Sequence, residues 1–308
     1  MRKYPINKEF FPQSYFYNPI RSARLAGWVG SLFKAPKRLF KDKEVMVTRK
    51  VINGYEKGEL EIFIYEPYGL EELAPCIVYY HGGGFIFGAG DYNYDIAKEY
   101  ALSVGAKLIF VNYRLAPKHP HPIPVEDCYA GLRFAFENAE KYGIDKTKIG
   151  VAGESAGGCL SAAVCLMARD RGTDMPAFQL LIYPVTDITM NTESNRKYTD
   201  TPVWNSKLSK MMWPAYVPDM TRDDICYAAP MQARHFGDLP SAYVEVAEFD
   251  CLHDEAINYA KAMREAGVSV EINETKGTMH GFDNVMNAST TRKVLQQRVE
   301  FMKKALVG

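Results

Sequence analysis

The stretch KIGVAGESAGGCLSAAVCLMA (148–168) constrains the fold of this chain more than any other. A β-rich run ends at Gly153, and after Glu154, Ser155 and Ala156 the sequence enters a helical pattern. A G-x-S-x-G pentapeptide between a strand and a helix predicts a sharp turn that presents its serine as a nucleophile. Small neighbours are needed because the strained turn leaves no room for side chains. The alternative, a small-residue helix start that only permits close packing, explains this placement less well.

The middle of the chain alternates short β-rich runs with longer helical patterns. This alternation is typical of a mostly parallel sheet covered by helices on both faces. The first two runs are joined by NGYEKG without a helix and predict an antiparallel hairpin, whereas the later runs are almost continuously apolar, as strands buried on both faces are. Eight strands are predicted, at 44–52, 60–66, 76–80, 107–113, 148–153, 179–184, 242–248 and 268–275. Helices are predicted at about 93–104, 124–142, 156–169, 254–266 and 290–306.

Three consecutive glycines follow the third predicted strand, in the sequence His81-Gly82-Gly83-Gly84. Such glycines let backbone N–H groups approach a ligand closely, as an oxyanion hole requires. A phosphate cradle is the rival interpretation. However, neither G-x-G-x-x-G nor G-x-x-x-x-G-K-[ST] fits the glycines of this region.

HGGGF (81–85), GESAGG (153–158) and YRLAP (113–117) followed by PIPVEDCYAG (122–131) together resemble the hormone-sensitive-lipase-like family of α/β-hydrolases. The resemblance runs from about residue 60 to the C-terminus. It implies an α/β-hydrolase fold, with an eight-stranded mostly parallel sheet, helices on both faces and a helical cap. It also implies carboxylesterase activity on a small-molecule ester, without a cofactor. The residue before the serine is usually Asp or Thr in that family, so Glu154 is a mild departure.

In an α/β-hydrolase the serine is followed along the chain by an acid and then by a histidine. Asp250 lies just past the seventh predicted strand and aligns with the family's acid, although the usual proline after it is Cys251 here. Asp254 is the alternative acid, but with Glu255 it is better explained as a helix-start residue that matches the helix dipole. His280, in an HGF motif after the last strand, is the predicted base.

By the same resemblance, the N–H groups of Gly83, Gly84 and Ala156 form the oxyanion hole, and His81 has a structural role. A metal site at His119 and His121 would need a third ligand that we cannot locate. Prolines on either side also disfavour presentation of these histidines from a helix or strand, so no metal is predicted.

Bulk properties exclude several functional classes. Lys plus Arg equals Asp plus Glu at 37 each, which gives no electrostatic argument for nucleic acid. No window of eighteen apolar residues predicts a membrane span, and the N-terminus lacks the apolar core of a secretory signal. The six cysteines form no CxxC pair, so we expect them to be reduced and the protein to be cytoplasmic. The sequence leaves open whether the protein is a homodimer.

Two segments, 1–40 and 186–225, do not fit the alternation of strands and helices. A long insertion such as 186–225 is usually functional or disordered, and its aromatic content favours order. We expect residues 1–40 to form the N-terminal part of a cap over a catalytic domain at 41–308, with 186–225 as an inserted cap segment. The Trp and Met residues at 204–220 are candidates to line an apolar acyl pocket.

The first 40 residues carry eight Lys or Arg and one acidic residue. Leu25, Trp28, Val29, Leu32 and Phe33 form an apolar stripe at helical spacing. A helix on a membrane surface would have this pattern. A helix laid over the active site explains the stripe equally well and matches the family, so we favour the cap.

The predicted function is therefore a serine carboxylesterase that hydrolyses short- to medium-chain acyl esters through Ser155, His280 and Asp250 and an acyl-enzyme. An arylformamidase-type amidase is the alternative enzyme, and a deacetylase of carbohydrates would be a special case of the esterase. A non-catalytic small-molecule receptor is the alternative from another class. The presence of all three triad residues argues against a receptor.

Overall fold

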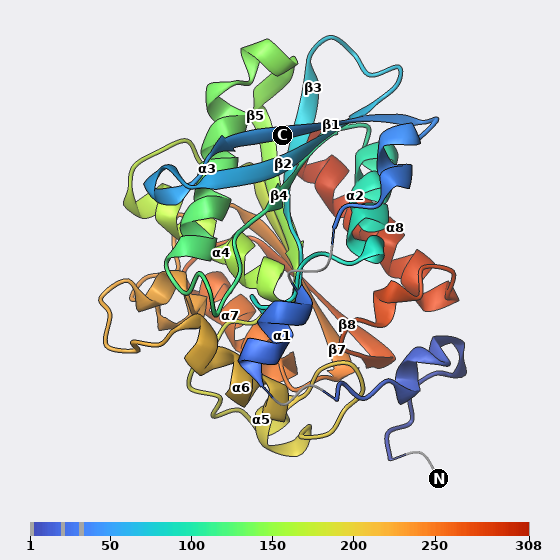
Figure 1. Cartoon of the computed structure of the whole chain (residues 1–308), viewed down its shortest axis with the longest axis vertical. Coiled ribbons are helices and arrows are strands. Elements are labelled where there is room, and N and C mark those ends of the chain that lie inside the picture. Colours follow the sequence, from blue (N-terminus) through green and yellow to red (C-terminus); the bar gives the residue numbers. More distant parts are fainter. Residues whose placement is uncertain (1–2, 20–21, 31–33, 308) are drawn as a thin grey trace.

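A single eight-stranded sheet runs through the computed structural model, which describes residues 3–19, 22–30 and 34–307 (Figure 1). Its strand order is β1-β2-β4-β3-β5-β6-β7-β8. The strands are β1 (Val45–Asn53), β2 (Glu59–Pro67), β3 (Ala74–Tyr80), β4 (Lys107–Asn112), β5 (Ile144–Glu154), β6 (Phe178–Ile182), β7 (Ser241–Phe249) and β8 (Val270–Met279). The predicted α/β class is confirmed, and every predicted strand is present with its ends moved by a few residues.

The hairpin and the parallel strands also match the prediction. β1 pairs antiparallel with β2, and β2 pairs antiparallel with β4. All other neighbours are parallel. Every residue of β6 is buried, as are six of the seven residues of β3. Burial on both faces explains why these strands lack an alternation of polar and apolar residues.

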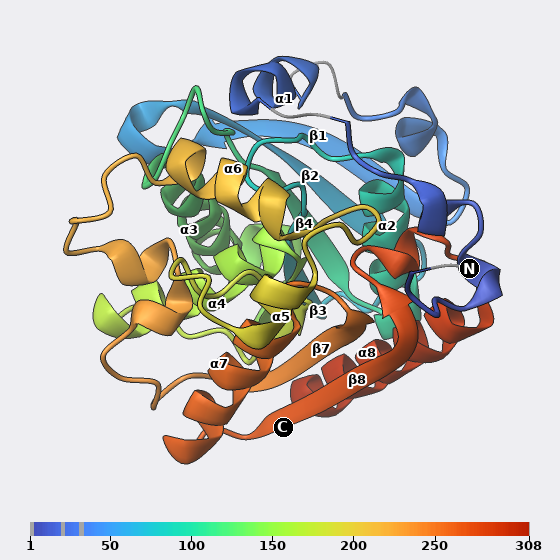
Figure 2. The same ribbon diagram turned by 90° about the horizontal axis from the view of Figure 1, so that it is seen from below.

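Helices cover the sheet on both faces (Figures 1 and 2). α2 (Asp91–Val104) and α8 (Ser289–Val307) lie on one face, and α3 (Ile123–Glu137), α4 (Ala156–Asp170) and α7 (His253–Glu265) lie on the other. α3 is shorter than the predicted 124–142, because the helix ends at Glu137 with Asn138 as its C-cap and a separate 3-10 turn, Glu140–Tyr142, follows. None of the described helices combines the length and the apolar character that crossing a bilayer requires.

The order of connections creates a crevice at the carboxyl ends of β3 and β5. These two strands are neighbours, but β3 leads through α2 to β4, and β5 leads through α4 to β6. Because α2 and α4 lie on opposite faces of the sheet, the loops that follow β3 and β5 diverge. Ligands of open α/β sheets bind at such a point of divergence.

The remaining described elements are short and lie outside the alternation of strands and helices. They include α1 (Ala23–Gly30), α5 (Glu193–Lys197) and α6 (Ser206–Tyr216), and α1 contacts α6. The 3-10 turns are Lys8–Phe10, Gln13–Tyr15, Lys37–Lys41, Tyr55–Lys57, Glu140–Tyr142, Ile225–Tyr227, Pro230–Gln232 and Phe282–Asn284.

The apolar stripe expected near the N-terminus does not form one buried face. Leu25 and Trp28 are exposed, and Leu32 and Phe33 lie outside the described residues. α1 packs instead through a glycine, because a Cβ added to Gly30 would lie 2.5 Å from the carbonyl oxygen of Ile86. Backbone packing of this kind leaves no signal in a pattern of apolar side chains.

The tightest backbone contact near the crevice is made by the first turn of α4. A Cβ added to Gly157 would lie 1.9 Å from the carbonyl oxygen of Tyr80, at the end of β3. We therefore expect Gly157→Ala to lower the free energy of unfolding by about 3 kcal/mol or more, since backbone on both sides must move. Urea denaturation followed by circular dichroism measures this change.

Gly90→Ala is the control for Gly157→Ala, because a Cβ there meets only ordinary contacts, the nearest at 3.5 Å. Equal losses of stability in the two variants would contradict the steric explanation.

Candidate active site

The turn between β5 and α4 holds Ser155 in a strained conformation. Its backbone lies at φ 56° and ψ −117°, a region that residues other than glycine rarely occupy. The strain is maintained by hydrogen bonds from Ser155 N–H to the Ile182 carbonyl at 2.8 Å and from Val185 N–H to the Ser155 carbonyl at 3.2 Å. Gly153 and Gly157 make the turn possible, since a Cβ on Gly153 would lie 2.4 Å from the backbone of Gly157.

Three predicted residues meet at the carboxyl edge of the sheet although they are far apart in the chain. His280 Nε2 lies 2.9 Å from Ser155 Oγ, and His280 Nδ1 lies 2.6 Å from Asp250 Oδ2. Ser155 follows β5, Asp250 follows β7 and His280 follows β8. All three are buried, and Asp250 Oδ1 also accepts a hydrogen bond from Leu252 N–H at 3.0 Å. The imidazole is therefore fixed between a hydroxyl and a carboxylate.

The alternative acid, Asp254, has other partners. Its Oδ1 lies 2.8 Å from His253 Nδ1, and its Oδ2 accepts a hydrogen bond from Ser194 N–H at 2.8 Å. Both partners lie away from His280, so the structure places Asp250 and not Asp254 beside the predicted base.

The glycine loop after β3 lies next to the serine turn. Gly83 and Gly84 adopt left-handed conformations with φ 113° and 57°. Within the described part of the chain, the N–H groups of Gly83, Gly84 and Ala156 donate to no other residue. Ala156 is the first residue of α4, where N–H groups have no partner within the helix and carry partial positive charge. These three groups are available to an anionic oxygen at the site.

His81, at the start of this loop, is a buried structural residue. Its ring stacks on Tyr113 with centroids 4.4 Å apart, and its Nδ1 lies 2.6 Å from the Gly82 carbonyl. Burial lowers the pKa of His81 to about 4, so it is neutral at pH 7. His81 therefore adds no positive charge beside the glycines.

Glu154 joins the serine turn to the glycine loop. Its Oε1 accepts hydrogen bonds from Gly82 N–H at 2.7 Å and from the Asn93 amide, and its Oε2 accepts one from the Tyr79 hydroxyl at 2.5 Å. Burial raises the pKa of Glu154 to about 8, although these donors favour the charged form.

A mostly apolar cavity of about 460 Å³ opens onto Ser155 and His280. Two separate segments contribute to its lining, Phe16, Pro19 and Val29 from the N-terminal region and Val203 and Trp204 from the insertion after β6. Residues from outside the sheet thus form much of its wall.

The Trp and Met residues at 204–220 are the predicted lining of an acyl pocket. Of these, only Trp204 is among the described residues that line this cavity. Tyr216 instead stacks on Phe85 with ring centroids 3.7 Å apart, and Trp213 packs beside the same ring. Met220 is exposed. The aromatic content of the insertion therefore mainly anchors α6 to the loop after the glycines.

Sequence reasoning missed a buried charged network beneath the histidine. Arg298 of α8 is fully buried, with ion pairs to Glu245 at 2.5 Å and to Asp283 at 2.8 Å. Asp283 also accepts a hydrogen bond from the Tyr183 hydroxyl at 2.5 Å, and the Tyr183 ring centroid lies 4.6 Å from that of His280. An arginine in an amphipathic helix is normally solvent-exposed, so no local pattern indicates this network.

Glu255 lies in the first turn of α7, as predicted for a helix-start residue. It is also buried, and its carboxylate accepts hydrogen bonds from Thr186 N–H, Asp187 N–H and the Asn195 amide. Burial raises the pKa of Glu255 to about 8. The residue therefore fixes the start of the insertion to the sheet domain.

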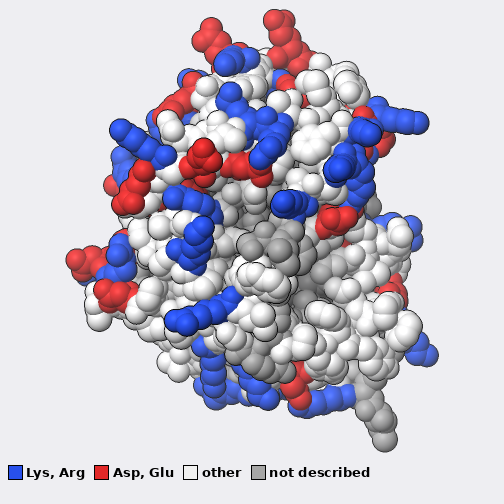
Figure 3. Space-filling view, in the orientation of Figure 1, with Lys and Arg blue, Asp and Glu red and all other residues white. Residues whose placement is uncertain are grey.

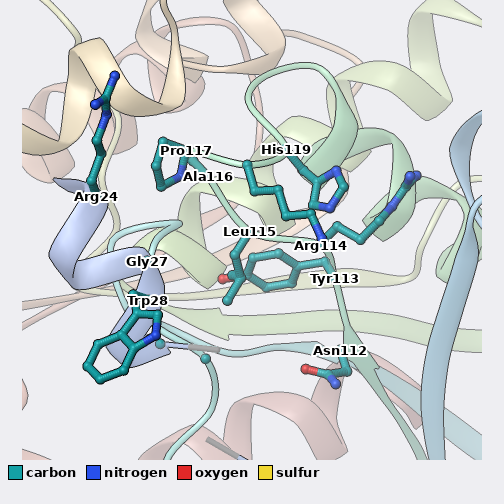
Figure 4. Close-up of a pocket in the computed structure, with 13 residues that line it drawn as sticks. Arg24, Gly27, Trp28, Asn112, Tyr113, Arg114, Leu115, Ala116, Pro117 and His119 are labelled. Carbon is teal, nitrogen blue, oxygen red and sulfur yellow. The ribbon is translucent and has the colours of Figure 1, made fainter. Parts of the chain in front are cut away.

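A second cavity, of about 800 Å³, is lined in part by Arg24, Gly27 and Trp28 of α1, and no Ser, Cys, Asp or Glu is among the described residues that line it (Figure 4). Arg24, Arg114 and His119 line it, but the ends of these side chains point in different directions. The Arg114 guanidinium is already paired with Asp127 at 2.7 Å. Size alone therefore does not identify the functional cavity here.

The charge balance of the sequence is also seen on the surface, since basic and acidic side chains are both distributed over the face in Figure 3. Among the described residues, no group of three or more His, Cys, Asp or Glu is arranged to hold a metal ion.

The raised pKa of Glu154 predicts how stability depends on pH. The folded protein holds this proton up to about pH 8, whereas the unfolded chain releases it near the ordinary glutamate pKa of 4.5. Between these values the folded state binds more protons, so the free energy of unfolding falls as pH rises. Glu154→Gln, which mimics the protonated acid, should reduce that slope by up to about 1.4 kcal/mol per pH unit.

Urea denaturation at pH 5, 6, 7 and 8 measures the slope. The control is Glu300→Gln on the exposed surface of α8, which should keep the wild-type slope. A slope in Glu154→Gln equal to that of the wild type would contradict the assignment.

Comparisons with known proteins agree with this fold and site. Residues 77–284 match the family model described as alpha/beta hydrolase fold. Carboxylesterase NlhH of Mycobacterium tuberculosis is 35% identical over 245 residues, covering 78% of this chain and 76% of that protein. Ethyl acetate hydrolase of Pseudomonas putida is 31% identical over 210 residues, covering 67% and 65%. The solved structure of a bacterial heroin esterase superimposes with a TM-score of 0.86 at 30% identity, covering 98% of both chains.

The matched region contains the serine turn, the glycine loop, Asp250 and His280. The chain therefore belongs to the α/β-hydrolase-fold family, in the hormone-sensitive-lipase-like group that its motifs resemble.

Proposed function

We propose that this protein is a serine carboxylesterase that hydrolyses short- to medium-chain acyl esters through an acyl-enzyme. The observation that carries the proposal is the position of His280, with its two ring nitrogens 2.9 Å from Ser155 Oγ and 2.6 Å from Asp250 Oδ2. An imidazole held in this way can accept the serine proton at one nitrogen while it donates to a carboxylate at the other. The names of the relatives, which record ester hydrolysis, support the same activity.

In the proposed acylation step, Ser155 Oγ attacks the ester carbonyl carbon and His280 Nε2 accepts its proton. The carbonyl oxygen becomes an oxyanion, which the N–H groups of Gly83, Gly84 and Ala156 stabilise. Asp250 holds the imidazole in the correct tautomer and stabilises its charged form. His280 then returns the proton to the leaving alkoxide, and the alcohol departs.

In the proposed deacylation step, water replaces the alcohol. His280 accepts a proton from water as its oxygen attacks the acyl carbon, and the same three N–H groups stabilise the second oxyanion. Collapse of this intermediate breaks the bond to Ser155 Oγ, which recovers its proton from His280. No other group is needed to balance the reaction.

The size and lining of the cavity support short- to medium-chain acyl groups. A cavity of about 460 Å³ is at the small end of the usual range for ligand sites. We propose that residues 1–40 and 186–225 act together as a cap. Their shared contribution to this lining supports that role, as does the hydrogen bond from Val203 N–H to the Phe16 carbonyl at 2.8 Å.

We also propose that the protein works in a reducing compartment such as the cytoplasm. All six cysteines are unpaired, and five of them are buried. Burial raises the pKa of Cys76 to about 12, so this thiol is unreactive. Such cysteines behave as small core residues and need no oxidising environment.

The nucleophile is tested with p-nitrophenyl acetate, butyrate, octanoate and palmitate. We expect the acetate and butyrate to be hydrolysed fastest, with a burst of p-nitrophenol that reports formation of the acyl-enzyme. Ser155→Ala should abolish both the burst and the turnover. Stopped-flow absorbance measures the burst.

Ser161→Ala is the matched control, since Ser161 lies in α4, the helix that begins after Ser155, is buried and donates to the Gly157 carbonyl. It should keep the burst. A burst that survives in Ser155→Ala would identify another nucleophile, and absence of turnover on every ester would contradict the esterase and lead to tests of aryl formamides.

The choice of acid is tested by Asp250→Asn. This change removes the carboxylate that orients His280, and we expect kcat to fall by a factor on the order of 10⁴. Asp254→Asn is the control and should leave kcat near that of the wild type, because its partners are His253 and Ser194. A larger loss in Asp254→Asn than in Asp250→Asn would reverse the assignment.

A further inference from the structure

The turn formed by Val203 and Trp204 bridges the two loops that carry the reaction. A Cβ added to Gly84, in the glycine loop, would lie 2.5 Å from Cη2 of Trp204. A Cβ added to Gly281, the residue after His280, would lie 3.3 Å from Cγ1 of Val203. The turn therefore lies directly against both the oxyanion side and the histidine side of the cavity.

Val203 occupies a backbone conformation that is costly for its side chain. Its φ is 64°, in the left-handed region, where a β-branched residue is a genuine outlier. Such strain persists only where surrounding contacts maintain it, and it concentrates at functional sites. This backbone conformation directs the Trp204 side chain toward the glycine loop and the Val203 side chain toward the loop after β8.

Several contacts hold Trp204 in one orientation. Its indole N–H donates to Ser209 Oγ of α6 at 2.9 Å, and its carbonyl accepts a hydrogen bond from the Thr201 hydroxyl at 2.7 Å. The preceding Val203 N–H donates to the Phe16 carbonyl at 2.8 Å. Trp204 is only 5% exposed. The indole is thus a rigid wall rather than a side chain that can swing aside for a larger substrate.

The position of this wall relative to His280 indicates which part of an ester it faces. In the proposed reaction the alkoxide oxygen must come within hydrogen-bond reach of His280 Nε2 to be protonated. The Trp204 ring approaches Gly84 through Cη2, and its centroid lies 6.2 Å from that of the imidazole. The group attached to the alkoxide oxygen would therefore meet the indole.

We propose that Trp204 is a specificity-determining residue that limits the size of the alcohol part of the ester. The proposal rests on the proposed esterase function and adds its preferred substrate class, esters of small alcohols. It differs from the expectation that the Trp and Met residues at 204–220 line an acyl pocket, because it assigns Trp204 to the other side of the scissile bond.

The test compares two series of esters in wild type and Trp204→Ala. Ethyl, butyl and hexyl acetates vary the alcohol, and p-nitrophenyl acetate, butyrate and octanoate vary the acyl chain. We expect Trp204→Ala to raise the ratio of kcat/KM for hexyl acetate to that for ethyl acetate by about tenfold or more, the discrimination typical of a few methylenes in a pocket. The ratio of kcat/KM for p-nitrophenyl octanoate to that for p-nitrophenyl acetate should stay at the wild-type value.

Trp204→Phe guards against a failure of Trp204→Ala to fold. It keeps an aromatic ring but loses the hydrogen bond to Ser209. It should therefore raise the ratio of kcat/KM for hexyl acetate to that for ethyl acetate by a smaller factor than Trp204→Ala. Trp213→Phe is the matched control in the same insertion, outside the cavity lining, and should keep both ratios. Thermal melts by circular dichroism establish that each variant is folded.

Unchanged ratios in both series, a shift in the acyl series alone, or equal shifts in both series would overturn the proposal. Each of these outcomes requires an active wild type and leaves the esterase function intact. Lack of wild-type turnover on every ester would instead overturn the esterase function, and the proposal with it.

Discussion

The close approach of Gly157 to the carbonyl of Tyr80 determines where both halves of the site lie. Tyr80 ends β3 and leads into the glycine loop, and Gly157 belongs to the first turn of α4, just past Ser155. Because no Cβ intervenes, the N–H groups after β3 and the serine after β5 become neighbours. Glu154 also connects these two loops, because its carboxylate accepts a hydrogen bond from Gly82 N–H. A single backbone contact thus supports the nucleophile and the groups that would stabilise its product.

The histidine depends on a different kind of support. Arg298 neutralises Glu245 and Asp283 in the interior, and Tyr183 connects Asp283 to the face of the His280 ring. A buried ion pair of this kind is weak evidence for stability, because desolvation offsets much of the attraction. Its effect here is geometric, since Arg298 and Tyr183 together hold Asp283 in the loop after β8. The two supports come from different strands, the first from the ends of β3 and β5 and the second from β7 and the loop after β8.

Much of this arrangement could be predicted from sequence because it depends on local patterns. The serine turn, the glycine loop and the eight strands each have a signature within about ten residues. Asp250 and His280 could be predicted because the family places its acid and then its histidine after the serine. The wall of the cavity had no such signature. In the sequence Trp204 is one of several aromatic residues in the insertion, and its contact with Gly84 and its place in the cavity lining distinguish it only in the folded chain. Arg298 likewise looks like an ordinary helix residue until the fold buries it.

The lining of the cavity comes partly from inside and partly from outside the region that matches the family model. The match to the family model begins at residue 77, yet Phe16, Pro19 and Val29 line the same cavity as Ser155. Residues before the matched region can therefore change the shape of the cavity without touching the nucleophile, the acid or the base. Val203 N–H also donates a hydrogen bond to the Phe16 carbonyl, so a change in one of these two segments affects the position of the other. New substrate preferences are thus most accessible through paired changes in these two distant segments, with the reaction itself left intact.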